Sequence, residues 1–255
     1  MGVRGWVLGV GEASAALSVT QPLTPITRHP TLDTPMKANL LLFDLDGTLI
    51  DSLGDLAATI NLMLRDVDRP PITREQVGAF IGHGIPTTVH RALVATHPNQ
   101  QPPDAELHQL AIATVHRHYA DEMLKTTRLF PGVVETLEHF HDKRLAVVTS
   151  KEVRFTHLML DHFGIAKYFD AIVGGDTTPA RKPDPRPVLE ALRLLQGSAD
   201  AGVMIGDSES DVLAGRNAGT KTCAVTFGYR SAEQLRLTEP DVLIDHFEQL
   251  QEVIE

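Results

Sequence analysis

Hydrophobic residues are arranged along the chain in two alternating patterns. Short uninterrupted apolar runs are typical of strands buried on both faces of a parallel sheet, whereas apolar residues spaced three or four positions apart are typical of amphipathic helices. We predict strands at residues 38–44, 145–149, 171–173, 203–206, 222–226 and 242–244. Helices are expected between them, ending near residues 142, 163, 195 and 218. Strands that alternate with helices predict an α/β fold, with a doubly wound parallel sheet and right-handed crossovers.

Residues 53–128 differ from the rest of the chain because they show helical periodicity only. A capping-box pattern at Thr73–Gln76 is expected to begin a short helix, and Asp51 or Ser52 is expected to cap the first helix of the region. No strand is expected here, so we interpret the region as an α-helical domain inserted after the first strand. Its predicted helices cover residues 53–66, 85–95 and 104–124, with the short one ending at residue 80.

These patterns divide the chain into three parts. Residues 37–52 and 129–255 are expected to form a core domain around the sheet, and residues 53–128 the helical domain. Residues 1–36 are rich in Gly, Thr and Pro and show no sustained periodicity. We therefore expect this segment to be a disordered N-terminal extension.

Composition and charge narrow the classes of function. The 255 residues are 42% hydrophobic and 22% charged, which is ordinary for a globular protein. The formal net charge of -10 argues against nucleic acid as a partner, since phosphate backbones bind basic surfaces. No apolar run approaches the roughly 20 residues of a membrane-spanning helix. The one cysteine, Cys223, excludes an intramolecular disulfide and favours a reducing compartment, so we expect a cytoplasmic monomer or homodimer.

The first predicted strand ends in two carboxylates, Asp44 and Asp46. Residues two apart in an extended chain point the same way, so both carboxylates can face one site. Gly47 then permits a sharp turn. Two neighbouring negative charges are costly unless a cation or a shared proton relieves them, and a hard divalent cation such as Mg²⁺ prefers carboxylate oxygens. The sequence therefore predicts a metal site at the end of this strand.

Polar residues also follow the other predicted strands. Because the carboxyl ends of parallel strands meet at one edge of a sheet, we expect these side chains to surround one crevice. Carboxylates, a lysine and a hydroxyl together can bind a metal ion and a phosphate. The residues are Thr149, Ser150 and Lys151 after the second strand, Lys182 after the third, and Asp207 and Asp211 after the fourth.

Phosphoryl transfer gives these residue types distinct tasks. The reaction needs an in-line nucleophile, cations on the non-bridging oxygens and a proton donor for the leaving oxygen. Asp44 is the candidate nucleophile, which would form an aspartyl-phosphate, and Asp46 is the candidate general acid and base. Asp207 is a candidate metal ligand, and Lys182 can pair with both the phosphate and the nucleophile.

Four stretches of the chain, in this order, are similar to the motifs of a known superfamily. They are Asp44-Leu45-Asp46-Gly47-Thr48, the apolar strand ending in Thr149, Lys182-Pro183, and Gly206-Asp207-Ser208 followed by Asp211. In these motifs the chain resembles the haloacid dehalogenase-like superfamily of phosphatases. The resemblance implies a Mg²⁺ cofactor, a small phosphorylated metabolite as substrate, and a four-helix cap, formed by residues 53–128, that covers the crevice.

Within that superfamily, the chain looks most like the bacterial phosphoglycolate phosphatases, over roughly residues 37–250. The supporting stretches include residues 80–84, 165–169 and 225–229. This closer resemblance implies hydrolysis of 2-phosphoglycolate. Two positions depart from the usual pattern, because Ser150 and His83 stand where asparagine is common in these enzymes.

The same resemblance implies roles for individual residues. Thr149 and the backbone N–H of Ser150 would bind the phosphate, with Lys182 as a clamp. Closure of the cap would bring Gly82, His83 and Gly84 over the substrate. The metal ion would be held by the Asp44 carboxylate, the Asp46 carbonyl oxygen, Asp207 and, through water, Asp211.

Other functions remain open from the sequence. A sugar phosphate or an amino-sugar phosphate is the main alternative substrate, and a phosphomutase is less well supported. A dehalogenase would have no use for Asp46 or a metal ion. A catalytically silent metabolite-binding protein is expected to have lost at least one of Asp44, Asp46, Lys182 and Asp207, and all four are present.

Overall fold

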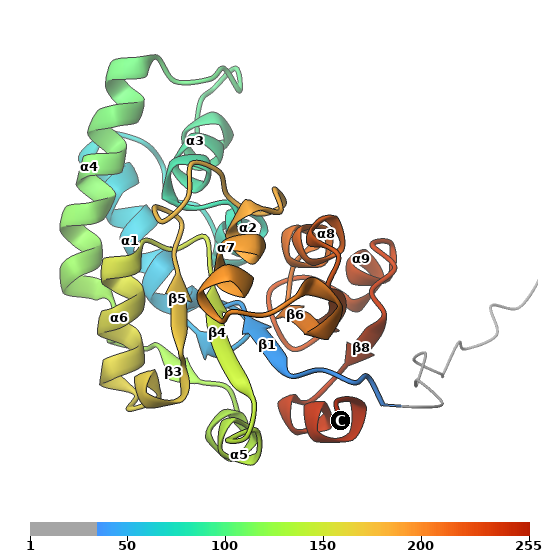
Figure 1. The fold of residues 1–255 in the computed structure, drawn as a ribbon. Helices are drawn as coiled ribbons and strands as arrows, with labels where there is room; N and C mark the ends of the chain where they lie inside the picture. The colour runs from blue at the N-terminus through green and yellow to red at the C-terminus, as the bar shows by residue number, and fades with distance from the viewer. Residues whose placement is uncertain (1–34) are drawn as a thin grey trace, which may run out of the picture.

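The computed structural model describes residues 35–255, which form a six-stranded sheet with helices on both faces (Figure 1). The strand order is β5-β4-β1-β6-β7-β8, and neighbouring strands run parallel. The strands are β1 (Leu40–Phe43), β4 (Arg144–Val148), β5 (Ala171–Val173), β6 (Gly202–Gly206), β7 (Lys221–Val225) and β8 (Val242–Ile244). The prediction of a doubly wound parallel sheet is confirmed, and the predicted extension lies, up to residue 34, outside the described residues.

Both faces of the central strand β1 are covered, as its uninterrupted apolar sequence predicts. Leu40 and Leu42 pack in the cluster formed with α7 and α8, whereas Leu41 and Phe43 pack in the cluster formed with α5, α6 and α10. The helices of this part are α5 (Val133–His139), α6 (Val153–His162), α7 (Arg186–Leu194), α8 (Glu209–Ala218), α9 (Ala232–Arg236) and α10 (Leu250–Val253). Single 3₁₀ turns lie at Ala166–Tyr168, Ala199–Ala201 and Phe247–Gln249.

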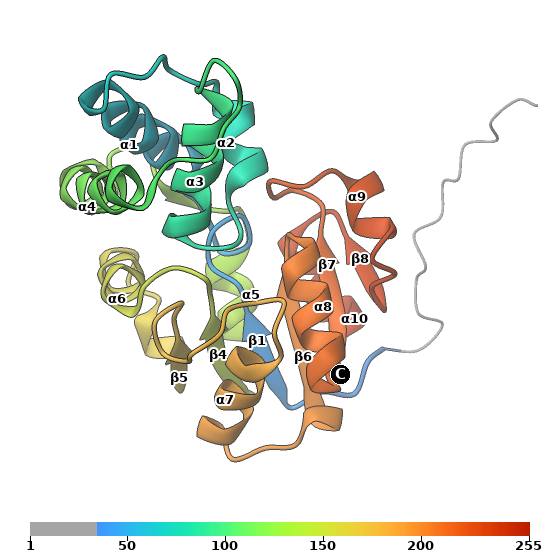
Figure 2. The same ribbon diagram turned by 90° about the horizontal axis from the view of Figure 1, so that it is seen from above.

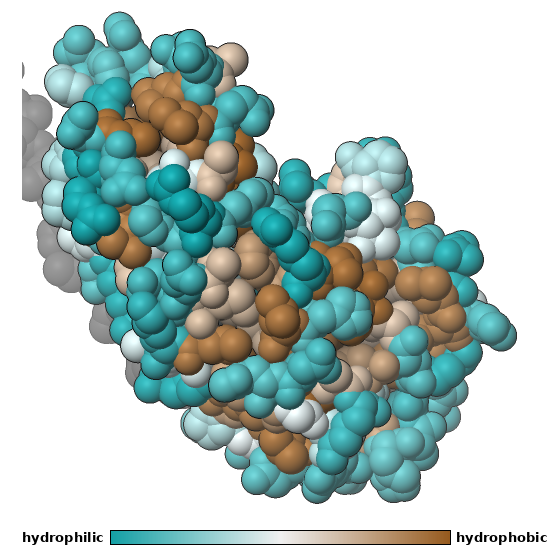
Figure 3. Space-filling model, turned by 90° about the vertical axis from the view of Figure 1, so that its left-hand side faces the viewer, coloured by the Kyte–Doolittle hydropathy of each residue, from teal (hydrophilic) through white to brown (hydrophobic). Residues whose placement is uncertain are grey.

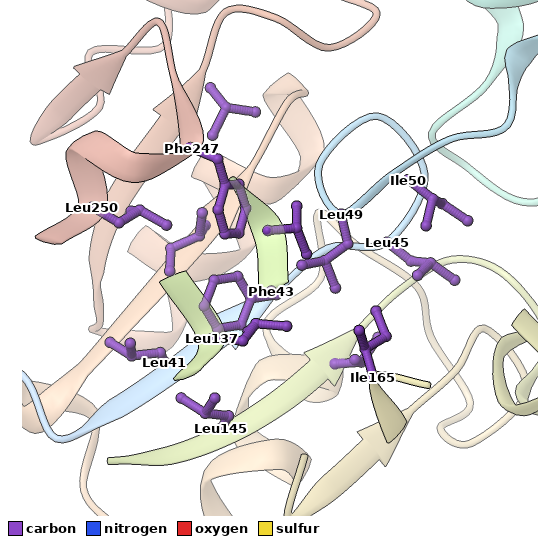
Figure 4. Close-up of a cluster of buried hydrophobic side chains, with 14 of the residues drawn as sticks. Leu41, Phe43, Leu45, Leu49, Ile50, Leu137, Leu145, Ile165, Phe247 and Leu250 are labelled. Atoms are coloured by element: carbon purple, nitrogen blue, oxygen red, sulfur yellow. The ribbon is translucent and has the colours of Figure 1, made fainter. Parts of the chain in front are cut away.

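Phe43, the last residue of β1, anchors the end of the strand in the larger cluster (Figure 4). Its ring stacks on that of Phe247 with centroids 6.0 Å apart, and Leu137 of α5 lies beside it. Full burial of a side chain of this size stabilises the fold by roughly 1.5–3 kcal/mol. The packing of Phe43 therefore holds the next residue, Asp44, in a fixed place.

Four of the helices between β1 and β4 form a separate unit (Figure 2). This helical unit has its own buried core, in which Met63, Val77, Val89 and Val115 are at most 1% exposed. Its helices are α1 (Leu53–Asp66), α2 (Arg74–Phe80), α3 (Ile85–Ala95) and α4 (Ala105–Glu122). The expected capping box at Thr73 is present, with the Gln76 N–H donating to the Thr73 hydroxyl.

At the two ends of the helical unit, the structure differs from the prediction at one strand and decides between two predicted caps. Ile50–Asp51 (β2) and Arg128–Leu129 (β3) form a short antiparallel ribbon, and β3 begins within residues 53–128, where no strand was expected. Strands of two residues are too short to show a periodic pattern. Of the two predicted caps of α1, Asp51 Oδ1 accepts from the Leu53 N–H at 3.4 Å, whereas the Ser52 hydroxyl donates to Asp46 Oδ1 at 2.5 Å. A charged acceptor makes the stronger hydrogen bond.

Met36, which the sequence assigns to the end of the extension, is paired with the C-terminal segment. Its N–H donates to the Val253 carbonyl oxygen at 2.7 Å, and its carbonyl oxygen accepts from the Glu255 N–H at 2.9 Å. The Met36 side chain is buried in the larger cluster.

The surface of the described residues carries scattered apolar side chains. On the face seen in Figure 3, hydrophobic areas are interrupted by hydrophilic residues. The exposed large hydrophobic side chains are Leu110, Leu158, Leu189, Leu194 and Leu237, which belong to α4, α6, α7 and the end of α9. In residues 35–255, no helix is long and apolar enough to cross a membrane.

Candidate active site

Asp44 leaves the end of β1 at the centre of the sheet, between β4 and β6. Gly47 makes the turn that follows, with φ of +90°. A Cβ atom at Gly47 would lie 2.3 Å from Asp207 Oδ2, so any side chain here would collide with that carboxylate. The turn therefore needs glycine both for its backbone conformation and for the approach of Asp207 to Asp44.

Lys182 joins two of the predicted carboxylates. Its ammonium group lies 2.8 Å from Asp44 Oδ1 and 2.5 Å from Asp211 Oδ1, and it donates to the Val148 carbonyl oxygen at 2.7 Å. All three ammonium protons thus have acceptors. Burial disfavours the charged form, but the charges of Asp211 and Asp44 outweigh it, so the pKa of Lys182 is raised. Lys182 is a permanent positive charge between the two carboxylates.

Asp44, Asp207 and Asp211 form a buried cluster, with one oxygen from each lying within 4.8 Å of the others. Burial is the largest cause that raises the pKa of Asp44 to about 7; the Lys182 charge opposes it, and the Asp211 charge adds to it. Burial and the charges of Asp211 and Asp44 also raise the pKa of Asp207 well above its ordinary value. Such a site is short of positive charge.

The donor atoms of this cluster fit a hard divalent cation. Asp44 Oδ2 and Asp207 Oδ1 accept no hydrogen bond from the part of the chain that the structure describes, whereas Asp207 Oδ2 accepts from the Tyr229 N–H at 2.7 Å. Carboxylate oxygens are the ligands that Mg²⁺ prefers. These two free oxygens are therefore the candidate direct ligands.

Asp211 is held differently, because both of its oxygens already have partners. Oδ1 faces Lys182, and Oδ2 accepts from the Ser208 N–H at 3.0 Å and the Ser208 hydroxyl at 2.6 Å. This capping box begins α8. The helix cap is thus present, and the contact of Asp211 with a metal ion through water stays a prediction.

Asp46 has a separate set of partners. Its Oδ1 accepts from the Ser52 hydroxyl, and its Oδ2 lies 3.0 Å from the Lys151 ammonium. Ser52 is held in turn by Tyr229, whose hydroxyl oxygen accepts from the Ser52 N–H at 2.9 Å. The Asp46 carboxyl group is thus directed away from Lys182 and toward the helical unit, although it follows Asp44 by only two residues.

The predicted phosphate-binding residues lie beside these aspartates. Thr149 is buried at the end of β4, and its hydroxyl oxygen accepts from the Lys151 N–H at 3.2 Å. The Ser150 hydroxyl donates to the Gly82 carbonyl oxygen at 2.9 Å, which joins the core to the loop between α2 and α3. Gly84 begins α3 with φ of +82°.

His83 is separated from the enclosed part of the site. Gly82 and Gly84 line the cavity next to Asp44 and Asp46, but His83 lies toward two outer grooves. Burial and the nearby charges of Arg91 and Arg230 lower the pKa of His83. The other predicted site residues lie around the cavity and the carboxylate cluster, whereas His83 lines an outer groove together with Lys182.

A small cavity of about 50 Å³ lies between the end of β1 and the helical unit. Apolar side chains from three helices of the unit form its far wall, and polar groups form the wall at the sheet. It is lined by Asp44, Asp46, Leu56, Thr59, Ile60, Ile81, Gly82, Gly84, Ile85, Thr88, Val115, Tyr119, Thr149, Ser150 and Lys151.

Sequence reasoning did not predict which residues surround Asp46. Ser52, Tyr119, Lys151 and Tyr229 surround Asp46 through direct or relayed hydrogen bonds. Lys151 was expected at the crevice, but its partners Asp46 and Tyr119 were not predicted. Ser52 was expected only as a helix cap, Tyr229 lies in one of the stretches that support the resemblance, and Tyr119 carried no motif.

The fold and the carboxylate cluster define a phosphatase of one large family. The model of the haloacid dehalogenase-like hydrolase family matches residues 41–225, and the chain belongs to this family. It is 38% identical to the phosphoglycolate phosphatase of Photobacterium profundum over 216 residues, which are 84% of this chain and 94% of that protein. It is 37% identical to the phosphoglycolate phosphatase of Pseudomonas fluorescens Pf-5, over 83% of this chain and 78% of that protein.

Solved structures give the same result. The crystal structure of a predicted phosphoglycolate phosphatase from Haemophilus somnus 129PT matches with a TM-score of 0.80 and 30% identity, covering 85% of this chain and 98% of that one. The crystal structure of a predicted phosphatase from Clostridium acetobutylicum matches with a TM-score of 0.74 and 26% identity, covering 84% and 97%. The chain is therefore an enzyme that hydrolyses phosphoric monoesters.

Proposed function

We propose that the protein is a Mg²⁺-dependent hydrolase of 2-phosphoglycolate that works through an aspartyl-phosphate on Asp44. The observation that carries this proposal is the separation of Asp44 and Asp46. Asp44 is buried against Lys182, while Asp46 contacts Lys151 and Ser52 on the other side of the turn. Two carboxylates in different surroundings can perform different steps of one reaction.

The balance of charge supports a divalent cation. Asp44, Asp46, Asp207 and Asp211 bring four carboxylates, and the contacting cations are Lys151 and Lys182. Two negative charges are left over in a buried site when all six groups are ionised, and one divalent cation would balance them. Bound there by Asp44, Asp207 and the Asp46 carbonyl oxygen, Mg²⁺ would neutralise charge on the phosphate oxygens.

The side chains then divide the reaction between them. An oxygen of Asp44 attacks phosphorus as the bond from phosphorus to the ester oxygen breaks, and Asp46, which is in its protonated form at this step, gives its proton to that leaving oxygen. Asp46 next takes a proton from the water that attacks the aspartyl-phosphate, which releases inorganic phosphate and restores Asp44. Lys182 keeps Asp44 oriented, and Thr149 with the Ser150 N–H binds the phosphate.

Substrate size is the basis for naming 2-phosphoglycolate. Curated relatives carry that name, and the cavity of about 50 Å³ has room for on the order of four water-sized groups. The organic part of 2-phosphoglycolate is of this size, whereas a sugar is larger. We further propose that the helical unit, residues 53–128, is a cap domain on a core of residues 37–52 and 129–255, in a cytoplasmic enzyme.

The first test is Asp44→Asn with p-nitrophenyl phosphate and with 2-phosphoglycolate. Turnover of both should fall to background while the circular dichroism of the folded protein is kept. Asp51→Asn is the matched control, because Asp51 lies seven residues on and pairs with the exposed Arg128. Near wild-type hydrolysis of p-nitrophenyl phosphate by Asp44→Asn would refute the mechanism.

A second comparison separates Asp46 from Asp207. Asp46→Asn should keep Mg²⁺ affinity but lose most turnover, because the metal ion would contact only the Asp46 backbone. Asp207→Asn should weaken Mg²⁺ binding itself, as measured by calorimetry. Equal loss of Mg²⁺ affinity in both variants would contradict this division.

A panel of phosphate esters compared by kcat/KM tests the substrate. A preference for 2-phosphoglycolate of less than about tenfold, or roughly 1.4 kcal/mol of transition-state binding, would refute the substrate assignment. The assignment as a phosphatase would still hold.

A further inference from the structure

Lys151 and Tyr119 form a pair of buried donors in the wall of the cavity. The Lys151 ammonium donates to the Tyr119 hydroxyl oxygen at 2.5 Å, and Lys151 and Tyr119 are 8% and 1% exposed. Tyr119 comes from α4 of the helical unit and Lys151 from the end of β4, so the pair is complete only when the unit lies over the sheet. Both residues line the cavity.

Each of the two groups has a proton left over. The ammonium has three protons, of which one points to Asp46 Oδ2 and one to Tyr119. Tyr119 accepts that hydrogen bond, and its own hydroxyl proton has no acceptor among the described residues. Burial is the main cause that raises the pKa of Tyr119 to about 12, so the hydroxyl keeps its proton. Two donors therefore face the cavity without an acceptor.

Apart from Lys151, no positively charged side chain of the described residues lines the cavity, so an anion bound there would have no other cation to contact. Lys151 is the one basic residue among those lining the cavity, and most of the remaining wall on the helical unit is aliphatic, including Ile60, Ile81 and Ile85. An anionic group buried there without a cation would be strongly disfavoured. A charged organic group on a substrate must therefore lie against Lys151.

Lys151 lies where it can contact a substrate carboxylate that is close to the ester oxygen. Its Nζ lies 3.0 Å from Asp46 Oδ2, the proposed proton donor to the leaving oxygen. In 2-phosphoglycolate, the carboxylate carbon is separated from that oxygen by one methylene carbon. When Asp46 protonates the ester oxygen, the carboxylate falls beside Lys151.

We propose that Lys151 and Tyr119 bind the carboxylate of the substrate through the Lys151 ammonium and the Tyr119 hydroxyl, and that this pair selects small phosphoesters carrying a carboxylate. The inference rests on the proposed function and specifies the part of the site that recognises the organic group. It also explains why an acidic phosphoester would be preferred by a protein whose net charge is -10.

The experiment compares kcat/KM for 2-phosphoglycolate and ethyl phosphate, which has a methyl group in place of the carboxylate. The wild-type protein should prefer 2-phosphoglycolate by about 30-fold or more, as expected for hydrogen bonds to a charged group. Lys151→Met should reduce that preference to less than about threefold. Tyr119→Phe should reduce it by about tenfold, and it keeps the ring that packs on Phe155. Intrinsic differences in reactivity between the two esters cancel when the variants are compared.

Ser52→Ala is the matched control, because Ser52 contacts the other oxygen of Asp46 and does not line the cavity. It should lower kcat/KM for both esters equally and leave the preference unchanged. If Lys151→Met and Tyr119→Phe also lower kcat/KM for both esters by the same factor, the pair only positions Asp46 and the inference is wrong. If the wild-type protein shows no preference at all, 2-phosphoglycolate is not the substrate and the inference fails with it. Release of phosphate from ethyl phosphate would still identify a phosphatase.

Discussion

The Nζ of Lys182 lies 2.8 Å from Asp44 Oδ1, and both side chains are almost completely buried. The same ammonium group also faces Asp211, so one cation lies between two carboxylates that would otherwise repel each other. Breaking a buried ion pair by removing one partner costs about 3–5 kcal/mol, because the other partner is left uncompensated. Lys182 is therefore a stabilising residue as well as a catalytic one.

Lys182→Met should lower kcat by about 100-fold or more and should lower the free energy of unfolding of the metal-free protein by about 3 kcal/mol. Urea unfolding and steady-state turnover measure the two effects. Arg193→Met is the control, since it removes an exposed i,i+3 pair with Glu190 and should change stability by at most about 0.5 kcal/mol. Unchanged stability in Lys182→Met would show that the two carboxylates do not depend on this cation.

The raised pKa of Asp44 predicts how the stability of the metal-free protein depends on pH. In the folded protein this carboxyl titrates at about 7, above its ordinary value of 3.8, chiefly because it is buried. A raised pKa favours folding at low pH, so the contribution is complete below pH 3.8 and is lost as the pH rises through 7. Asp44→Asn should gain stability relative to the wild-type protein over this range. A constant difference between the two proteins from pH 4 to pH 8 would contradict the shift.

The same pKa predicts the pH dependence of metal binding. Below pH 7 a divalent cation must displace the proton from Asp44, so Mg²⁺ affinity should fall by up to about tenfold for each pH unit and each displaced proton. Above pH 7 the affinity should change little. Calorimetry at pH 6 and pH 8, in two buffers with different ionisation enthalpies, measures both the affinity and the proton release. Equal affinity at the two pH values would refute this prediction.

Asp55 ties the start of the helical unit to its end. Its carboxylate is buried in the first turn of α1 and accepts hydrogen bonds from the N–H and hydroxyl groups of Thr126 and Thr127, at 2.6–3.1 Å. Burial opposes ionisation, but these hydrogen bonds outweigh it and lower the pKa of Asp55. The stability that Asp55 contributes is therefore present above pH 3.8 and lost as the pH falls below it.

Asp55→Asn should destabilise the protein by about 2–3 kcal/mol at neutral pH, because an amide cannot accept all of these hydrogen bonds. Urea unfolding measures the loss. Asp51→Asn, four residues earlier, breaks pairs with the exposed Arg128 and Arg74 and should cost at most about 1 kcal/mol. Equal losses in the two variants would show that the carboxylate of Asp55 has no special role.

The sequence predicted the sheet, the helical unit and the placing of Asp44, Asp207 and Asp211, since each follows an apolar run and the ends of parallel strands meet. It could not predict the surroundings of Asp46. Lys151 was expected at the crevice, but not as a partner of Asp46, and Tyr119 lies on a helix whose rotation about its axis the sequence did not reveal. These contacts depend on how the helical unit lies over the sheet, which no local pattern records.

Ser52 shows the same limit at a single residue. Serine before a helix predicts an N-cap, and the position is right, but the hydroxyl donates to Asp46. The choice between a helix N–H and a carboxylate depends on the turn at Gly47, which brings residue 46 back beside residue 52. Local propensity could give the helix start but not the partner of the hydroxyl.

Arg230 holds the helical unit against the core from the loop after β7. Its guanidinium donates to the carbonyl oxygens of Gly78 at 2.8 Å and Ile81 at 2.6 Å, at the end of α2, and its Nε lies 3.2 Å from Glu209. Together with the hydrogen bond from Ser150 to Gly82, this contact closes the cavity on the side of the α2–α3 loop. The closed form therefore depends on an arginine outside the four sequence motifs.

Arg230→Met should lower kcat/KM by about tenfold or more, because each hydrogen bond from a charged group is worth roughly 1.5–3 kcal/mol in the closed form. Hydrogen exchange of the backbone amides in residues 78–84 should become faster in the same variant. Arg216→Met is the control. This exposed arginine donates to the carbonyl oxygens of Thr238 and Glu239, which belong to the same domain as Arg216 and not to the helical unit. It should leave both measurements unchanged. If Arg230→Met matched the wild-type protein in turnover and in exchange, the closed form would not depend on this contact.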